Sequence, residues 1–407
     1  MANIIYFEAT GVWGGERKEV RLNDKMNFLV GINGSGKTTI LKIIHAISAI
    51  DIQAISKLPF SSAFILLNDT TKISVGKDRG TIELSISDTE SFFSYDFDME
   101  DHDFINNKKI ESIKEVVTNK LNVKFLSINR KDSFDTYDYN PFGEREEQAP
   151  VDIKLDEISA RIVSEFSKMS QRFNSIATRF QKNIFFKMLD IPSENEISIY
   201  KDEVDINSEK MAISEIMSFF INKNSKSDSM SKVDKYYSRL SESIKKMQSG
   251  IKTPGNNPDV SDFSIVFNAW RTKSLIGDYE QLKASKKKIF HRQEVFLNVI
   301  NSFFPHNKKI IFSKDNQLEI QIDNRSHSLE ILSSGEKQMI ILLGECFLID
   351  DSEAVYIADE PELSLHVKWQ DKIVDALVSL NPNAQYIFAT HSPDIVGRRK
   401  ESLIRIR

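Results

Sequence analysis

The most constraining feature of the 407-residue sequence is a glycine-rich loop between an apolar strand and a helix. Residues 26–30 are predicted to form the strand, and residues 39–50 place apolar side chains at helical spacing. The loop between them reads Gly31-Ile-Asn-Gly-Ser-Gly-Lys-Thr38, a full match to G-x-x-x-x-G-K-[ST]. Its glycines let backbone N–H groups wrap closely around phosphate oxygens, helped by the helix N-terminus. We therefore expect an α/β fold that binds the phosphates of a nucleotide.

The residue types in this loop indicate a nucleoside triphosphate with Mg²⁺. Lys37 is expected to reach the β- and γ-phosphates, and the hydroxyl of Thr38 is expected to ligate Mg²⁺. A chance glycine turn is the alternative, but the flanking strand and helix argue against it. The predicted cofactors are ATP and Mg²⁺. The loop residues predicted to bind them are Asn33, Gly34, Ser35, Gly36, Lys37, Thr38 and Thr39.

A pair of acids follows another apolar strand late in the chain. The run Val355-Tyr-Ile-Ala-Asp-Glu360 indicates a buried strand that ends in two carboxylates. We expect Asp359 in the shell of the Mg²⁺ ion and Glu360 as the catalytic residue that orients or deprotonates the attacking water. A strand followed by Asp-Glu is weak evidence alone. Because the phosphate-loop lysine needs such a partner, the two motifs together predict ATP hydrolysis.

A serine motif shortly before the acidic strand narrows the class of ATPase. Leu332-Ser-Ser-Gly-Glu-Lys-Gln338 opens a predicted helix and resembles the signature sequence of ABC-type ATPases. In that family the signature contacts the γ-phosphate held by the opposing subunit, so the resemblance implies a dimer that sandwiches ATP. The predicted contacts are Ser333, Ser334, Gly335 and Glu336, because a helix N-terminus favours an anion. The serines also fit an N-cap with Glu336 just inside the helix, and a capped helix is how such a site is built.

Two segments near the acids resemble further parts of the ABC-type site. Residues 361–366 resemble the D-loop, which lies along the dimer seam in that family. Within it, His366 alternatively caps or packs the following helix. Residues 390–393, Thr-His-Ser-Pro, resemble the switch segment. The resemblance makes His391 a predicted catalytic residue that hydrogen-bonds the γ-phosphate.

The glutamine loop of that family has no clear counterpart. Residues 127–130, Ser-Ile-Asn-Arg, follow a predicted strand but contain no Gln. Asn129 is one candidate for its role, and a different strand is the alternative. Arg130 either reaches phosphate or is a surface side chain.

Helical periodicity separates the two halves of this predicted ATPase core. The insertion between these halves is predicted to begin with one long helix. Three later helical stretches are predicted at residues 208–221, 232–247 and 263–304, the last as one or two helices. The first helix of the insertion has apolar residues at steps of three and four, as in a helix pair or coiled-coil seam. They are Ile158, Ile162, Phe166, Met169, Phe173, Ile176, Phe180, Ile184 and Met188.

The predicted fold class is α/β, an ABC-type P-loop ATPase head with a mixed sheet and flanking helices, split by a helical, coiled-coil-like insertion. Its predicted domains are residues 1–150 and 307–407 for the two halves of the core, and residues 151–306 for the insertion. Short strands are predicted within residues 62–86 and at 123–128, and a hairpin joins 310–312 to 318–322.

Charge is distributed unevenly around a net value of −5. From Lys223 to Lys314 the chain has 18 basic and 8 acidic side chains, a net of +10, which leaves −15 for the rest. The basic region fits either a phosphate-binding face or a solvated helical surface. The acidic stretch from Asp96 to Asp103 fits a solvated loop better than a cation site.

The single cysteine and the apolar pattern bear on the compartment. Cys346 excludes an internal disulfide and a thiolate metal cage, and its apolar neighbours predict a buried structural thiol. The N-terminus lacks a signal-peptide pattern, and no apolar run reaches the roughly 18 residues of a membrane helix. We therefore expect a cytoplasmic protein without a membrane partner.

The motifs also indicate a branch of the ABC-type ATPases. Asp-Glu-Pro-Glu-Leu-Ser-Leu-His at 359–366 and the signature at 332–338 resemble the OLD, RecF and SMC-like branch rather than membrane transporters. The resemblance covers residues 1–130 and 308–400. Many OLD-type proteins carry a nuclease domain after the switch histidine, and this sequence leaves no room for one. It therefore resembles the stand-alone ATPase of bacterial antiphage systems of the Septu (PtuA-like), PARIS (AriA-like) or retron-associated kind.

Three functions compete on these grounds. The first is an ATP-gated scaffold and sensor that assembles with itself and controls a separate effector, such as a nuclease. The second is a DNA-repair or DNA-clamp ATPase of the RecF or SMC kind, which the basic region favours and which predicts salt-sensitive DNA affinity. The third, a self-contained nuclease or toxin, lacks a His/Asp/Glu cluster apart from the ATP site.

Overall fold

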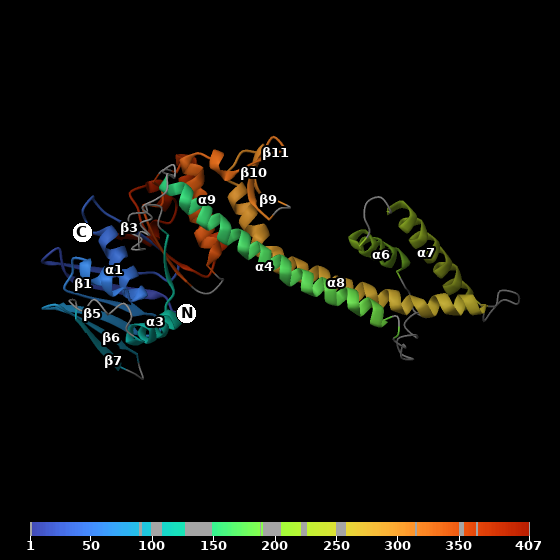
Figure 1. Ribbon diagram of the computed structural model, residues 1–407, viewed down its shortest axis with the longest axis horizontal. Coiled ribbons are helices and arrows are strands. Elements are labelled where there is room, and N and C mark those ends of the chain that lie inside the picture. Colours follow the sequence, from blue (N-terminus) through green and yellow to red (C-terminus); the bar gives the residue numbers. More distant parts are fainter. Residues whose placement is uncertain are drawn as a thin grey trace, which may run out of the picture. The chain divides into compact units, whose positions relative to one another are not determined.

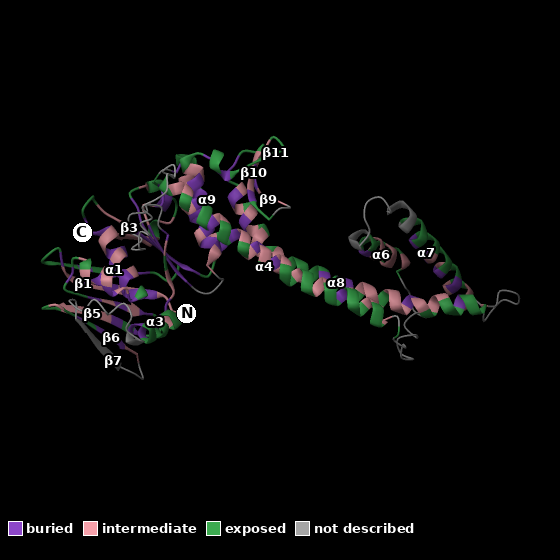
Figure 2. Cartoon of the chain, viewed as in Figure 1, coloured by how far each residue is buried: buried purple, intermediate pink, exposed green. Residues whose placement is uncertain are grey.

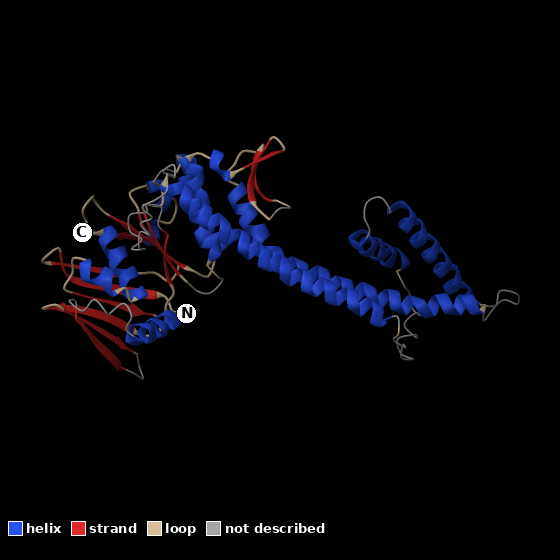
Figure 3. Ribbon diagram, in the orientation of Figure 1, coloured by secondary structure: helices blue, strands red, loops and turns tan. Residues whose placement is uncertain are grey.

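The chain forms two compact units, Met1–Glu165 with Gln293–Arg407 (unit 1) and Phe166–Arg292 (unit 2). In Figure 3 the strands belong to unit 1, and unit 2 is helical. The predicted domain limits of 151 and 306 stay a prediction, since α4 (Pro150–Lys187) and α8 (Val260–Asn301) each run through a unit boundary. The computed structural model describes residues 2–88, 92–98, 108–126, 149–187, 189, 205–220, 226–249, 258–313, 316–349, 354–363 and 365–406.

A five-stranded parallel sheet of order β14-β3-β13-β12-β8 carries the phosphate-loop strand. β12 and β13 are buried along nearly their whole length, as expected when both faces of a parallel sheet are covered. Strands from both halves of the sequence pair in this sheet, so the predicted mixed α/β head is confirmed. The edge strand β14 was not predicted. The strands are β3 (Met26–Val30), β8 (Val123–Leu126), β12 (Val355–Asp359), β13 (Gln385–Ala389) and β14 (Leu403–Arg405).

A six-stranded antiparallel sheet of order β2-β1-β4-β5-β6-β7 forms a second layer. Buried and exposed residues alternate along β4 and β6, because one face of the sheet meets the core. Residues 96–98 of the acidic stretch lie in β7 and pair with β6, so the loop prediction is wrong there; residues 99–103 lie outside the described residues. The strands are β1 (Ile4–Val12), β2 (Glu16–Arg21), β4 (Ser62–Leu67), β5 (Lys72–Asp78), β6 (Thr81–Ser87) and β7 (Phe92–Asp98).

Helix α1 (Lys37–Ala49) packs against strands of both sheets (Figure 1). Its apolar side chains belong to one buried cluster with residues of β1, β4, β12 and β13. α2 (Ile52–Lys57) follows α1 in the chain, and α3 (Lys108–Lys120) packs beside α1. Figure 2 shows the buried positions that this packing produces. The phosphate loop is therefore anchored at both ends in the core.

The C-terminal half adds a small sheet and two main helices. The predicted hairpin is confirmed as β9 (Lys308–Phe312) and β10 (Leu318–Ile322), and β11 (Arg325–His327) extends it into a sheet of order β11-β10-β9. Cys346 in α9 is buried, as predicted. The remaining elements are η5 (Leu329–Ile331), α9 (Ser334–Leu348), α10 (Val367–Leu380), α11 (Pro393–Val396) and η6 (Lys400–Ser402).

Unit 2 is built on the paired parts of α4 and α8, with α6 (Ile206–Phe220) and α7 (Lys226–Ser249). The rings of Phe173 and Phe290 lie 5.7 Å apart, and those of Phe180 and Tyr279 lie 6.2 Å apart. The predicted helix-pair seam is therefore confirmed. α4 has 38 residues, so it starts earlier than its apolar stripe suggested, and α8 is one helix of 42 residues. Met188 of the predicted stripe lies outside the described residues.

Candidate functional site

The phosphate loop runs from β3 into α1 and needs glycine at three positions. Gly34 and Gly36 have φ of 82° and 97°, where a side chain is strained. At Gly31 a Cβ atom would lie 2.6 Å from the backbone oxygen of Ile406, just after β14. The backbone just after the C-terminal edge strand β14 thus lies close to the start of the phosphate loop.

Two polar groups in the loop fit a bound phosphate. The hydroxyl of Ser35 is buried without a hydrogen-bond partner, and the side chain of Lys37 is nearly buried. The Lys37 ammonium donates to the carbonyl oxygens of Gly31 at 3.0 Å and Ile32 at 3.3 Å, so it lies across the loop. Because a buried polar group without a partner is costly, a phosphate oxygen would satisfy Ser35. Asn33, Gly34 and Gly36 lie on the same loop, and Thr39 lies in the first turn of α1.

The structure brings the predicted metal ligands together. The hydroxyl of Thr38 donates to Oδ1 of Asp359 at 3.1 Å, which joins the start of α1 to the end of β12. Burial raises the pKa of Asp359, and the hydrogen bond from Thr38 opposes that rise. A hydroxyl and a carboxylate are oxygen ligands of the kind that Mg²⁺ prefers. This pair can therefore hold the ion beside the phosphate loop.

Glu360 and His391 form a second pair beside the metal ligands. Nε2 of His391 lies 3.8 Å from Oε1 of Glu360, and both side chains are about one-third exposed. Glu360 has φ of +48°, an uncommon conformation for a residue with a side chain. Its N–H donates to the carbonyl of Ala389 on β13 at 2.8 Å, which fixes this bend. An acid and an imidazole thus reach solvent together, next to Asp359.

The signature residues form a capped helix start in a different part of unit 1. Ser333 and Glu336 make the predicted capping box at the start of α9. Burial favours the neutral form of Glu336, but the hydrogen bond from Lys308 at 2.7 Å and the capping bonds outweigh it and lower the pKa. Ser334 and Gly335 open the helix. Among the described residues, no hydrogen bond or ion pair joins positions 333–336 to the phosphate loop or the acids of the same chain.

The segment after the acids contains one predicted cap and one residue that the sequence did not single out. The side chain of His366 accepts from the N–H of Lys368, so it caps α10. Glu362 is buried and accepts hydrogen bonds from the loop that carries His391. Nothing in the local sequence distinguishes it from a solvated acid. The candidates for the glutamine loop, Asn129 and Arg130, lie outside the described residues.

Trp13 also lies beside the phosphate loop. Its indole ring would lie 3.3 Å from a Cβ atom placed on Gly36, and the side chain is 50% exposed. Trp13 has φ of +48° in the turn between β1 and β2. A solvent-exposed aromatic surface therefore borders the loop, which the strand pattern alone did not reveal.

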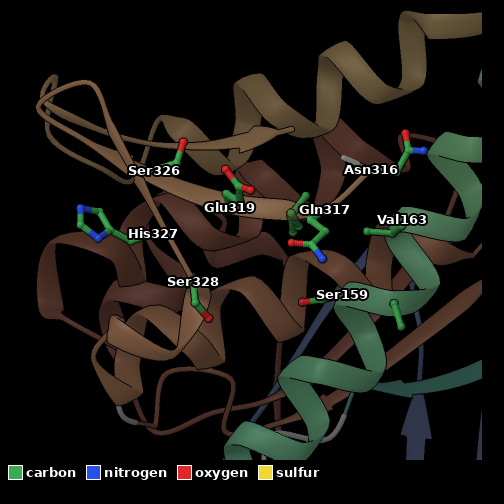
Figure 4. Close-up of a pocket in the computed structure, with 10 residues that line it drawn as sticks. Ser159, Val163, Asn316, Gln317, Glu319, Ser326, His327 and Ser328 are labelled. Carbon is green, nitrogen blue, oxygen red and sulfur yellow. The ribbon is translucent and has the colours of Figure 1, made fainter. Parts of the chain in front are cut away.

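A cavity of about 470 Å³ lies apart from these residues, between α4 and the small sheet. Figure 4 shows Ser159 and Val163 of α4 on one side, with Glu319 of β10 and Ser328 across from them. None of the predicted nucleotide-binding residues lines it. Ser328 in its wall directly precedes η5, which is followed by the signature at the start of α9.

The described residues contain neither a further cluster of metal ligands nor a membrane-spanning helix. No group of three or more His, Cys, Asp and Glu side chains there could hold a metal ion. None of the helices in those ranges combines the length and the apolarity needed to span a membrane.

Most of the chain matches one family of known proteins. The model of the family described as "AAA domain, putative AbiEii toxin, Type IV TA system" matches residues 26–397. The chain belongs to this family. The match begins with β3, before the phosphate loop, and ends at Gly397, after the switch segment. With the mixed α/β head and the loop motif, this match supports a P-loop ATPase domain.

Individual relatives match over shorter stretches. The "Retron Vc95 probable ATPase" of Vibrio cholerae serotype O1 biovar El Tor is 28% identical over 131 residues, which are 29% of this chain and 26% of that protein. The "Retron Ec83 probable ATPase" of Escherichia coli is 28% identical over 149 residues, 31% of this chain and 27% of that protein. The chain thus matches about a quarter of the length of these curated relatives. An Smc head domain with an extended coiled coil, from Pyrococcus furiosus, has a TM-score of 0.39 at 15% identity, over 100% of this chain and 94% of that one.

Proposed function

We propose that the chain binds ATP with Mg²⁺ and hydrolyses it to ADP and phosphate in a site completed by a second copy of itself. The observation that carries this proposal is the junction at the end of β12. There Asp359 accepts from Thr38 at 3.1 Å, and Glu360 lies 3.8 Å from His391. Metal ligands and an acid that positions the attacking water are recurring parts of sites for phosphoryl transfer to water. The imidazole of His391 adds a hydrogen-bond donor beside them.

Each residue then has a defined part in the reaction. The loop residues Asn33–Thr39 bind the phosphates through backbone N–H groups and side chains, and Lys37 turns from its carbonyl partners toward the β- and γ-phosphates. Thr38 and Asp359 would hold Mg²⁺, which neutralises phosphate charge when bound. Glu360 orients the attacking water and takes its proton. His391 donates a hydrogen bond to the γ-phosphate side.

The position of the signature supports the second copy. The N-terminus of α9 can present Ser334 and Gly335 to an anion, yet no hydrogen bond or ion pair in the described residues joins them to the phosphate loop of their own chain. An isologous dimer would place each signature over the ATP of its partner. Occupancy by ATP, rather than fast turnover, would then set the assembly state.

The reaction is tested with Glu360→Gln. The variant should lose about 100-fold or more of the hydrolysis rate, the usual range for removing a general base. It should keep ATP affinity and accumulate as an ATP-bound dimer in size-exclusion chromatography with light scattering. Glu401→Gln, the same change at an exposed glutamate of η6, is the matched control. Wild-type hydrolysis by Glu360→Gln would show that another residue activates the water.

We further propose that the dimer is a scaffold and sensor that controls an effector protein, such as a nuclease, in bacterial antiphage defence. The retron names of the two relatives support this context. An exposed apolar group at the end of α4 supports a protein partner: Phe185, Phe186 and Leu189 are 70%, 67% and 79% exposed. Co-purification of the neighbouring gene product should succeed, and Phe185→Ser with Phe186→Ser should weaken it. Failure to bind with ATP, ADP or no nucleotide would refute the scaffold role.

A basic stripe on α4 favours a second candidate, an ATPase that acts on DNA. From Phe166 to Lys187 this helix has five basic and no acidic side chains. Arg172, Arg179 and Lys182 are exposed and lie at spacings of seven and three, hence on one face of the helix. Such a row suits the phosphates of a nucleic-acid backbone.

The salt dependence of DNA binding distinguishes an ATPase that acts on DNA from a scaffold for an effector protein. If the stripe contacts phosphate, Arg179→Gln should weaken affinity for a short duplex and reduce the salt slope by about 1. Lys114→Gln on α3 removes one exposed charge elsewhere and serves as the control. Equal effects of the two changes, or no DNA binding at low salt, would remove this candidate.

A further inference from the structure

The carboxylate of Glu362 holds together two segments that carry the predicted catalytic pair. Its Oε1 accepts hydrogen bonds from the hydroxyl of Thr390 at 2.6 Å and from the N–H groups of His391 at 3.0 Å and Ser392 at 3.2 Å. Glu362 is 9% exposed, and Thr390 is fully buried. One oxygen atom therefore fixes three consecutive residues of the switch loop.

The Glu362 carboxylate is buried, so its hydrogen bonds to the switch loop must stay in place. Burial of a carboxylate is costly unless hydrogen bonds compensate it. In the part of the chain that the structure describes, Glu362 has no ion pair, and its Oε2 is buried without a partner. Among the described residues, the hydrogen bonds that compensate this burial come from Thr390, His391 and Ser392. Movement of the switch loop would leave the charge without its donors, so the loop is held in one place.

A glutamine on α10 makes a second connection between the same two segments. Nε2 of Gln370 donates to the carbonyls of Glu362 at 3.4 Å and Leu365 at 3.3 Å. Its Oε1 accepts from the hydroxyl of Ser392 at 2.8 Å. His391 thus lies between two anchored neighbours, while its imidazole remains 38% exposed.

The held loop faces the acid that precedes Glu362 by two residues. Glu360 has a left-handed backbone conformation, and its N–H bonds Ala389, just before Thr390. The 3.8 Å separation between Glu360 and His391 is therefore set by two ties, one at Ala389 and one at Glu362. We propose that Glu362 is a positioning residue, which keeps the His391 imidazole beside Glu360 and toward the γ-phosphate. This inference rests on the proposed ATPase function of the pair.

The proposal predicts a loss of rate without a loss of nucleotide binding. Among the described residues, no hydrogen bond or ion pair joins Glu362 to the phosphate loop or to Asp359, so ATP affinity should stay within about 3-fold of wild type. A misplacement of about 1 Å in a catalytic group can cost about 100-fold in rate. Thr390→Val keeps the shape of the side chain but removes the shortest hydrogen bond to Glu362. We expect it to lower kcat about 10-fold or more.

Thr390→Ser is the matched control, because it keeps the hydroxyl. Its kcat should return to within about 3-fold of wild type. Glu362→Gln tests the other partner: it keeps an acceptor oxygen but loses the charge, so its kcat should lie between wild type and Glu362→Ala. For each variant, kcat, the Kd for ATP and circular dichroism are measured at the same temperature. This comparison separates a misplaced histidine from an unfolded chain.

The outcomes decide the proposal without ambiguity. A fall in kcat for Thr390→Val, with rescue by serine and unchanged ATP affinity, supports it. Equal kcat for valine and serine, or a joint loss of folding and ATP affinity in valine but not serine, overturns it. Wild type and Glu360→Gln are assayed alongside. If wild type itself does not hydrolyse ATP, the proposed function fails; if only the Thr390 contrast is absent, the positioning role fails alone.

Discussion

Glu345 offers a quantitative test of the packing between α9 and α4. This carboxylate is buried on the helix that starts at the signature, with a side chain 15% exposed and Oε2 without a partner. Burial raises the pKa of Glu345 to about 7, against the opposing effect of Lys154, whose ammonium lies 3.4 Å away. Lys154 also contacts Glu157 at 3.0 Å, so Glu345→Gln leaves the lysine with a partner.

The raised pKa of Glu345 makes the stability of the folded chain depend on pH. Below the unfolded pKa of 4.5 the carboxyl group is neutral in both states and costs nothing. As the pH rises to 7, the unfolded chain releases the proton first, so the folded state loses stability. A shift from 4.5 to about 7 corresponds to about 3 kcal/mol at pH 8 as an order of magnitude. Glu345→Gln should therefore leave stability unchanged near pH 4.5 and raise it by up to about 3 kcal/mol at pH 8.

Urea denaturation at several pH values measures this difference. A Trp270→Phe background leaves Trp13 and Trp369, both in unit 1, as the fluorescent probes. Glu157→Gln removes a half-exposed partner of the same lysine and should change stability by less than about 1 kcal/mol. A Glu345→Gln chain that is less stable than wild type at pH 8 would show that the ion pair with Lys154 outweighs burial.

Four further substitutions test the phosphate loop and the helix contacts. Lys37→Ala should weaken ATP binding about 10- to 100-fold, because charge-assisted hydrogen bonds to phosphate are lost; equilibrium dialysis with unchanged affinity would contradict the site. Gly344→Ala should destabilise unit 1 by about 1–3 kcal/mol, because the new Cβ would lie 2.6 Å from Cγ2 of Ile158. Gly277→Ala, with no atom within 4 Å, should be neutral or stabilising by up to about 1 kcal/mol, and urea midpoints in the reverse order would refute the close helix contact. Gly36→Ala should weaken ATP binding about 10- to 100-fold in the same dialysis assay, since φ of 97° is strained for alanine by about 1–3 kcal/mol; unchanged affinity would show that the loop adapts.

Local sequence patterns predict the structure correctly where a segment's own residues determine its conformation. The strand, glycine loop and helix around Lys37 form as the motif predicts. The capping box of Ser333 and Glu336 and the cap at His366 were also visible, because caps depend on neighbours within a few residues. The buried seam of α4 followed from its apolar spacing for the same reason.

Contacts across the fold could not be predicted in this way. Glu362 and Thr390 are 28 residues apart, and only the parallel pairing of β12 with β13 brings their segments together. The approach of Trp13 to Gly36 depends likewise on how β1 and β2 lie over the phosphate loop. The sequence does contain a strand pattern for β7, because Phe93, Tyr95 and Phe97 alternate with polar residues. The acidic residues of the same stretch favoured the prediction of a solvated loop.

The central claim is that Lys37 of one chain and Ser334 of another act on the same ATP. Lys37→Ala and Ser334→Arg chains are purified separately, shown to be inactive, and then mixed in equal amounts for an ATPase assay. In a mixed dimer, the Ser334→Arg chain supplies an intact Lys37 and the Lys37→Ala chain supplies an intact Ser334, so one of the two sites is complete. Half of the dimers are mixed, so the account predicts recovery of about a quarter of wild-type turnover. Activity that stays at the level of the separate variants would place both residues in one chain's site and contradict the account.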